Sequence, residues 1–90
     1  MSDVHNNSAE NRFELEADGH VAMAHYRLTP GVITFTHTLV PKELEGRGIG
    51  SKLARGALDA ARTQGLKVVP KCPFIAGYIG KHPEYADLVV

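Results

Sequence analysis

The sequence is poor in the residues on which disulfides and metal sites depend. Cys72 is its only cysteine, so it can form neither an intramolecular disulfide nor a zinc site built on paired cysteines. The five histidines stand in no recognisable ligand spacing. We therefore expect no structural metal.

Net charge is lacking as well, because ten lysines and arginines balance ten aspartates and glutamates. Proteins that hold nucleic acid by its phosphates usually carry an excess of basic side chains, so no nucleic-acid partner is expected. The chain has no apolar run near the roughly 20 residues needed to cross a bilayer. Its polar N-terminus, MSDVHNNSAEN, is also unlike a signal peptide. We expect a cytoplasmic protein without a membrane partner.

What is present indicates one globular domain. Ninety residues are too few to close two hydrophobic cores, while a hydrophobic content of 43% is ordinary for a folded chain. Residues 1–11 are polar and lack periodicity, which predicts a disordered tail. Residues 12–90 are then the single domain.

Alternating apolar residues predict three antiparallel strands in the first half of this domain. Residues 12–28 predict a hairpin that turns at Asp18-Gly19, and residues 32–40 are rich in β-branched and aromatic side chains. From Ile49 the apolar period becomes helical, and Gly65 ends the helix. A fourth strand, within LKVVPKCPF, and a short last helix, IAGYIGK, follow. The predicted fold class is α/β of the α+β type: a mixed, mainly antiparallel four-stranded sheet with one main crossover helix and a short C-terminal helix.

The most informative segment is ELEGRGIGSKL, in which Gly46, Gly48 and Gly50 alternate where the predicted helix begins. Each glycine costs conformational entropy on folding, so three in alternation need a reason. A glycine-rich turn at a helix N-terminus binds anions, because its N–H groups point outward and the helix dipole favours negative charge. Arg47 adds a side chain that pairs with phosphate. We therefore predict a phosphate site.

Two familiar phosphate loops do not match this segment. A P-loop ends in Gly-Lys-Ser/Thr, whereas the order here is Gly50-Ser51-Lys52. A dinucleotide fingerprint needs an acidic residue about 20 positions further on and a larger parallel sheet than so short a chain allows. A flexible glycine-rich connection without a ligand remains the simpler alternative.

Three segments taken together, HTLVP, LEGRGIGSKL and LKVVPKCPF, resemble the GNAT superfamily of N-acetyltransferases. The resemblance is closer to a subgroup of very small, single-domain GNAT-like proteins, and it covers residues 12–88. Gly48-x-Gly50 is similar to the second half of the superfamily's pyrophosphate loop, Gln/Arg-x-x-Gly-x-Gly/Ala, while the first position is Glu45 here. The helices that usually cover the acceptor site are absent, as they are in the small subgroup.

The resemblance implies acetyl-CoA as the cofactor and an amine, in a small molecule or a protein, as the acceptor. The pyrophosphate of coenzyme A would lie on the amides of the glycine loop, and its pantetheine arm between the third and last strands, which diverge to form a cleft. Pro70 and Pro73 fit such a divergence, because proline cannot donate to a strand ladder. The cofactor-binding positions are expected to be Thr38, Leu39, Val40, Gly46, Arg47, Gly48, Ile49, Gly50 and Ser51.

Three residues are candidates for the chemistry. Cys72 matches the cysteine of the subgroup's CPF motif and would accept the acetyl group or line the pocket; its alternative is a small buried hydrophobic residue. His37 would take a proton from the amine or from Cys72, because imidazole titrates near neutrality; its alternative is a hydrogen-bonded strand histidine. The resemblance implies that Tyr78 protonates the departing CoA thiolate; its alternative is a core aromatic with a satisfied hydroxyl.

Several functions stay open at this point. In an N-acetyltransferase, the amine attacks the thioester directly while a strand amide at residues 39–40 stabilises the developing oxyanion. The other route passes the acetyl group through Cys72 in two steps. Outside enzymes, the same loop would suit a CoA-binding or sensing module without catalysis, or a phosphate- or nucleotide-binding domain. An exposed sheet edge predicts a monomer or a weak dimer.

Overall fold

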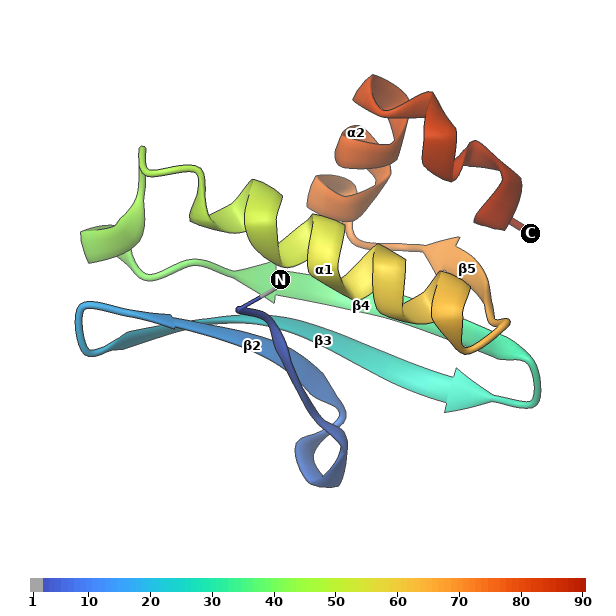
Figure 1. The fold of residues 1–90 in the computed structure, drawn as a ribbon, viewed down its shortest axis with the longest axis horizontal. Helices are drawn as coiled ribbons and strands as arrows, with labels where there is room; N and C mark the ends of the chain where they lie inside the picture. The colour runs from blue at the N-terminus through green and yellow to red at the C-terminus, as the bar shows by residue number, and fades with distance from the viewer. Residues whose placement is uncertain (1–2) are drawn as a thin grey trace.

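The computed structural model describes residues 3–90, in which one sheet carries helices on a single face (Figure 1). Its main elements are β1 (His5–Asn7), β2 (Arg12–Ala17), β3 (His20–Thr29), β4 (Val32–Leu39), α1 (Ile49–Thr63), β5 (Lys67–Pro70) and α2 (Pro73–Lys81). Short 3-10 helices lie at Ser8–Glu10, Lys42–Leu44 and Pro83–Leu88. The strands keep their chain order in the sheet; β1 to β4 are antiparallel neighbours and β5 runs parallel to β4. The predicted mixed, mainly antiparallel α+β fold is confirmed.

The sheet has five strands where four were predicted, because β1 lies within the expected tail over residues 1–11. β1 pairs with β2, and the Tyr26 hydroxyl donates a hydrogen bond of 2.7 Å to Asn6 Oδ1. The tail prediction is therefore corrected for the strand and the 3-10 helix that follows it; residues 1–2 lie outside the described residues. A short polar strand has no hydrophobic alternation of its own, so only contacts with distant residues reveal it.

α1 forms because its apolar side chains recur on one face. Leu53, Ala57 and Ala61 are buried on that face, and the helix contacts β2 and β3 (Figure 1). Gly48 is the N-cap, with a φ of 70°, and Gly65 turns the chain beyond the C-terminal end with the same φ. The predicted helix therefore has the expected start and stop.

The hydrophobic core fills the space between the sheet and the two helices. Its largest fully buried side chains are Ile33, Phe35, Leu44, Leu53, Leu58, Val68 and Ile75. Burying a side chain of this kind contributes about 1.5–3 kcal/mol. Among the described residues, no α-helix covers the opposite face of the sheet (Figure 1).

The C-terminal 3-10 helix is tied to α1 and β5. Arg62 donates two hydrogen bonds, of 2.9 and 3.0 Å, to the Asp87 carboxylate. The Tyr85 hydroxyl donates one of 2.6 Å to Asp59, and the Val90 amide donates one of 3.1 Å to a β5 carbonyl. The Val90 bond, with the bridge of Val89 to Val68, covers the edge of β5 that faces away from β4.

Candidate functional site

β4 and β5 separate part-way along the sheet. Among the described residues, their parallel pairing ends at Phe35 opposite Pro70. Pro70 has no N–H with which to extend the ladder, and the chain turns away into α2. β4 itself continues to Leu39, so the edge that it presents toward β5 beyond Phe35 has no strand partner. The ladder ends at Pro70, as the prolines lead one to expect, while the chain beyond it stays beside β4, because the Cys72 amide bonds to the Phe35 carbonyl.

A bulge at Thr36 decides which β4 side chains face the helices. His37 lies opposite His25, and Thr38 lies opposite Ala24, which is fully buried in the core. Thr38 therefore faces the helix side of the sheet, while His37 faces the uncovered side. Without the extra residue, simple alternation along β4 would exchange these two orientations.

Cys72 lies at the N-cap of α2 and is only 2% exposed. Its N–H donates a hydrogen bond of 3.0 Å to the carbonyl oxygen of Phe35, and its Sγ is 3.2 Å from Thr38 Oγ1. Two residues of β4 thus hold Cys72 at the point where the strands part. Of the predicted site residues, the structure brings Cys72 and Thr38 into contact.

His37 is placed elsewhere. It is exposed, and its ring stacks on that of His25, with centroids 4.4 Å and planes 20° apart. Partial burial, and then the charges of His37 and Arg12, lower the pKa of His25. Since Cys72 belongs to the core on the helix side, His37 and Cys72 lie on opposite sides of β4. A direct proton transfer from Cys72 to His37 is therefore not supported.

The glycine loop opens the N-terminus of α1. Gly46 and Gly48 have φ values of 79° and 70°, which few other residues adopt, and a Cβ on either would meet nothing within 4 Å. The first amides of a helix lack partners within it, and the first turn of α1 has no acidic side chain. Open space, free N–H groups and the positive end of a helix dipole fit an anionic pyrophosphate.

Gly50 has a different reason to be glycine. A Cβ there would lie 2.7 Å from Cζ of Phe74, which is closer than real atoms pack. The Phe74 ring, 43% exposed, therefore rests on the first turn of α1. The sequence predicts one role, an anion site, for all three alternate glycines. In the structure, Gly46 and Gly48 have a positive φ that favours glycine, whereas Gly50 lets Phe74 of α2 contact α1.

Arg47 is engaged within the protein. Its guanidinium forms an ion pair with Asp18 in the turn between β2 and β3, and the two side chains are 47% and 66% exposed. An exposed pair of this kind is worth about 0–1 kcal/mol, so a phosphate group could displace the carboxylate. The sequence offered no sign of Asp18 as a partner, because the two residues are 29 positions apart.

A groove of about 240 Å³ lies between the first turn of α1 and α2. Its lining residues are Ser51, Pro73, Phe74, Gly77, Tyr78, Lys81 and His82. The groove adjoins the glycine loop through Ser51, so a ligand whose phosphates lie on the loop could extend into it. Phe74, Lys81 and His82 were not predicted; the CPF motif that contains Phe74 was the available signal.

Tyr78 forms part of the wall of this groove. It is 8% exposed, and its ring stacks on that of His82 with a centroid distance of 3.9 Å. A tyrosine hydroxyl is protonated at neutral pH at its ordinary pKa, and burial raises the pKa of Tyr78 further. The structure places this predicted residue beside the groove, and none of the hydrogen bonds found within residues 3–90 joins it to Cys72.

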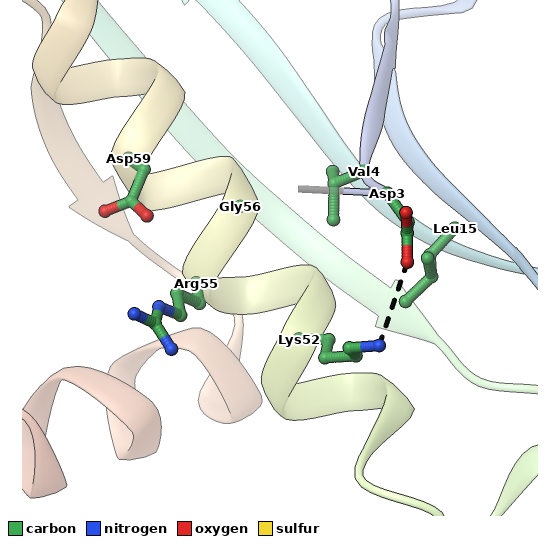
Figure 2. A pocket seen from close by; sticks show the side chains of 7 residues that line it. All are labelled: Asp3, Val4, Leu15, Lys52, Arg55, Gly56 and Asp59. Carbon is green, nitrogen blue, oxygen red and sulfur yellow. Dashed lines mark ion pairs between the residues drawn. The ribbon is translucent and has the colours of Figure 1, made fainter. Parts of the chain in front are cut away.

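A second hollow, of about 340 Å³, lies between α1 and the N-terminal residues beside β2 (Figure 2). It is lined by Asp3, Val4, Leu15, Lys52, Arg55, Gly56 and Asp59. Lys52 Nζ lies 3.8 Å from Asp3 Oδ2, and Figure 2 shows Arg55 pointing away from that pair. None of the predicted catalytic or cofactor-binding residues lines this hollow, so we place the candidate site at the gap, the glycine loop and the groove.

Comparison with known proteins identifies the family. Residues 12–88 match the model of a family described as GCN5-related N-acetyl-transferase. The chain belongs to this family. Its resemblance to the GNAT superfamily is thereby confirmed.

Individual relatives agree with this assignment. The solution structure of a GCN5-like protein from Staphylococcus aureus is similar to this GCN5-related chain with a TM-score of 0.74 and 31% identity, covering 100% of this chain and 91% of that one. Protein NATD1 of Homo sapiens and of Gallus gallus is 36% identical over 52 residues, or 58% of this chain. That match spans about half the length of those curated relatives, 46% and 47%.

Two absences within residues 3–90 concern metals and membranes. Within residues 3–90, no three histidine, cysteine, aspartate or glutamate side chains gather so as to hold a metal ion. In the same part of the chain, no helix is both long enough and apolar enough to span a membrane.

Proposed function

We propose that this GCN5-related protein transfers an acetyl group from acetyl-CoA to an amine. One arrangement carries the proposal: β4 beyond its pairing with β5 meets the buried thiol of Cys72, and α2, which begins beside that thiol, reaches the open N-terminus of α1 through Phe74. Membership of an N-acetyltransferase family supports acetyl transfer in general.

The glycine loop and the edge of β4 supply the groups that would hold acetyl-CoA. The amides of residues 47–51 would bind its pyrophosphate, with Arg47 released from Asp18. Those N–H and C=O groups of residues 38–40 that point away from β3 would hydrogen-bond the pantetheine arm. When bound, acetyl-CoA supplies an acetyl group already activated as a thioester.

In direct transfer, three protein groups would share the work. An amide at residues 39–40 would stabilise negative charge that develops on the carbonyl oxygen. His37, exposed on the uncovered side of the sheet, would receive a proton from an amine that arrives there. Tyr78, a tyrosine and so protonated at neutral pH, would give a proton to the leaving sulfur.

Cys72 provides the two-step alternative. Its sulfur would bond to the acetyl carbon while the bond from that carbon to the CoA sulfur breaks, and the thiol proton would pass to the CoA sulfur. The amine would then take the acetyl group from Cys72 and restore the thiol. Cys72→Ala should abolish turnover by this route, whereas retained turnover would leave direct transfer standing.

The cofactor is tested by titrating isotope-labelled protein with acetyl-CoA and following its amide NMR signals, with ATP as the comparison ligand. We expect shifts at residues 38–40, at residues 47–51 and around Cys72. An equal response to ATP that is confined to the glycine loop would instead identify a nucleotide- or phosphate-binding domain. No response to acetyl-CoA would refute the proposal.

One observation favours a second candidate, a CoA-binding or sensing module without catalysis. Cys72 is 2% exposed, and the predicted base His37 lies on the other side of β4. A panel of small amines, peptides with free N-termini and lysine peptides separates the two functions. Acetyl-CoA binding without acetylation of any of them, judged by mass spectrometry, would select the binding module.

A further inference from the structure

Within the described residues, the Thr38 hydroxyl is the side-chain partner that the structure gives to the Cys72 sulfur, at 3.2 Å. Water has little access to this contact, because Cys72 is 2% exposed and Thr38 is half-buried. The main chain of Cys72 is held separately: its N–H donates to Phe35 and its C=O accepts from Ala76, both at 3.0 Å. The contact with Thr38 therefore adds a directional restraint on the thiol to the packing of the core around it.

The strand prepares Thr38 for this contact. The bulge at Thr36 turns Thr38 to the helix side, opposite the small, fully buried Ala24. Threonine is stiff about its first side-chain torsion, so a hydroxyl on a paired strand is held in a narrow range of positions. Thr38 can thus hold a flexible partner in place.

We propose that Thr38 is a positioning residue, whose hydroxyl fixes the Cys72 sulfur at the end of the gap between β4 and β5. The proposal rests on the two-step form of the proposed function. A hydroxyl both donates and accepts hydrogen bonds, so Thr38 remains bonded to the sulfur before and after the thiol gives up its proton. Valine would have nearly the same shape and could do neither.

An infrared measurement tests the contact without any ligand. Because Cys72 is the only cysteine, the protein has one S–H stretching band. We expect Thr38→Val to shift this band and Thr38→Ser to restore it. Thr36→Val is the matched control, since it removes a hydroxyl from the same strand that contacts the His25 carbonyl at 3.3 Å instead. An unchanged band in Thr38→Val would overturn the proposal.

A kinetic measurement tests the consequence. Acetylation of Cys72 by acetyl-CoA is followed by mass spectrometry in a single turnover, alongside the dissociation constant for acetyl-CoA. We expect Thr38→Val to slow acetylation about tenfold, the scale set by one lost hydrogen bond, with less than a twofold change in the dissociation constant. Thr38→Ser and Thr36→Val should stay within twofold of the wild type.

The outcomes separate this proposal from the function on which it rests. Acetylation of Thr38→Val at the wild-type rate would overturn the role of Thr38 and leave the two-step route intact. Binding of acetyl-CoA without acetylation of wild-type Cys72 would overturn the two-step route, and the positioning role with it, while direct transfer would stand. A wild type that does not bind acetyl-CoA would refute the proposed function itself.

Discussion

Replacing Gly50 with alanine tests the close contact between α1 and Phe74. At an open helical position this change stabilises a protein by about 0.5–1 kcal/mol, because glycine loses more conformational freedom on folding. At position 50 the new Cβ would lie 2.7 Å from Phe74 Cζ, so the ring must move. Phe74 is 43% exposed, and complete burial of a phenylalanine is worth about 1.5–3 kcal/mol, so displacing it should cost about 1–2 kcal/mol. We expect Gly50→Ala to lower the free energy of unfolding by up to about 1.5 kcal/mol.

A double-mutant cycle measured by urea unfolding separates the two effects. In the Phe74→Ala background nothing obstructs the new methyl group, so Gly50→Ala should raise the free energy of unfolding by about 0.5–1 kcal/mol. Gly77→Ala in α2 is the matched control, because a Cβ there meets nothing within 4 Å, and the same gain is expected in either background. If Gly50→Ala is equally stabilising with and without Phe74, the contact does not explain this glycine.

Three further predictions concern charge. Asp18→Asn should free Arg47 and so tighten the binding of acetyl-CoA, measured by calorimetry. It should change the free energy of unfolding by less than about 1 kcal/mol, because the ion pair is exposed. Weaker binding of acetyl-CoA would contradict a phosphate role for Arg47. Burial and the Asp59 carboxylate raise the pKa of Tyr85 from 10.0 to about 12, so its contribution to stability is present below pH 10 and is lost as the pH rises toward 12. Tyr85→Phe should remove that loss from alkaline unfolding curves. Burial, the neighbouring imidazole and a guanidinium lower the pKa of His25 below 6.5, so stability present above pH 6.5 should fall as the pH drops below it. A His25→Phe variant that keeps the same acid dependence would refute this assignment.

Most of the fold follows from local patterns in the chain. Alternation predicted β2, β3 and β4, and the helical period from Ile49 to Gly65 predicted α1, because each pattern matches the burial of one face. β1 escaped prediction since its three residues, HNN, are polar and depend on pairing with β2. A hydrophobic period within a segment cannot predict a strand that is stable only when it pairs with another strand.

The site was less predictable, because its geometry depends on register and long-range packing. The side on which His37 lies is set by the bulge at Thr36, which exists only in the pairing of β3 with β4. The contact of Gly50 with Phe74 likewise depends on how α2 docks on α1. The glycine loop and Cys72 could be recognised because short motifs mark them, but a motif does not state which neighbours its side chains will have.

The chain order of the strands has a kinetic consequence. β1 to β4 are sequential antiparallel neighbours joined by short connections, so most of their contacts are local and give this part of the sheet a low contact order. β5 pairs only after α1 has carried the chain back to the sheet, which adds the entropy of closing a longer loop. We expect the meander of β1 to β4 to fold first and β5 to dock late. Substitutions in β5 should then accelerate unfolding more than they slow folding, and the gap beside β4 should be among the first parts of the molecule to open.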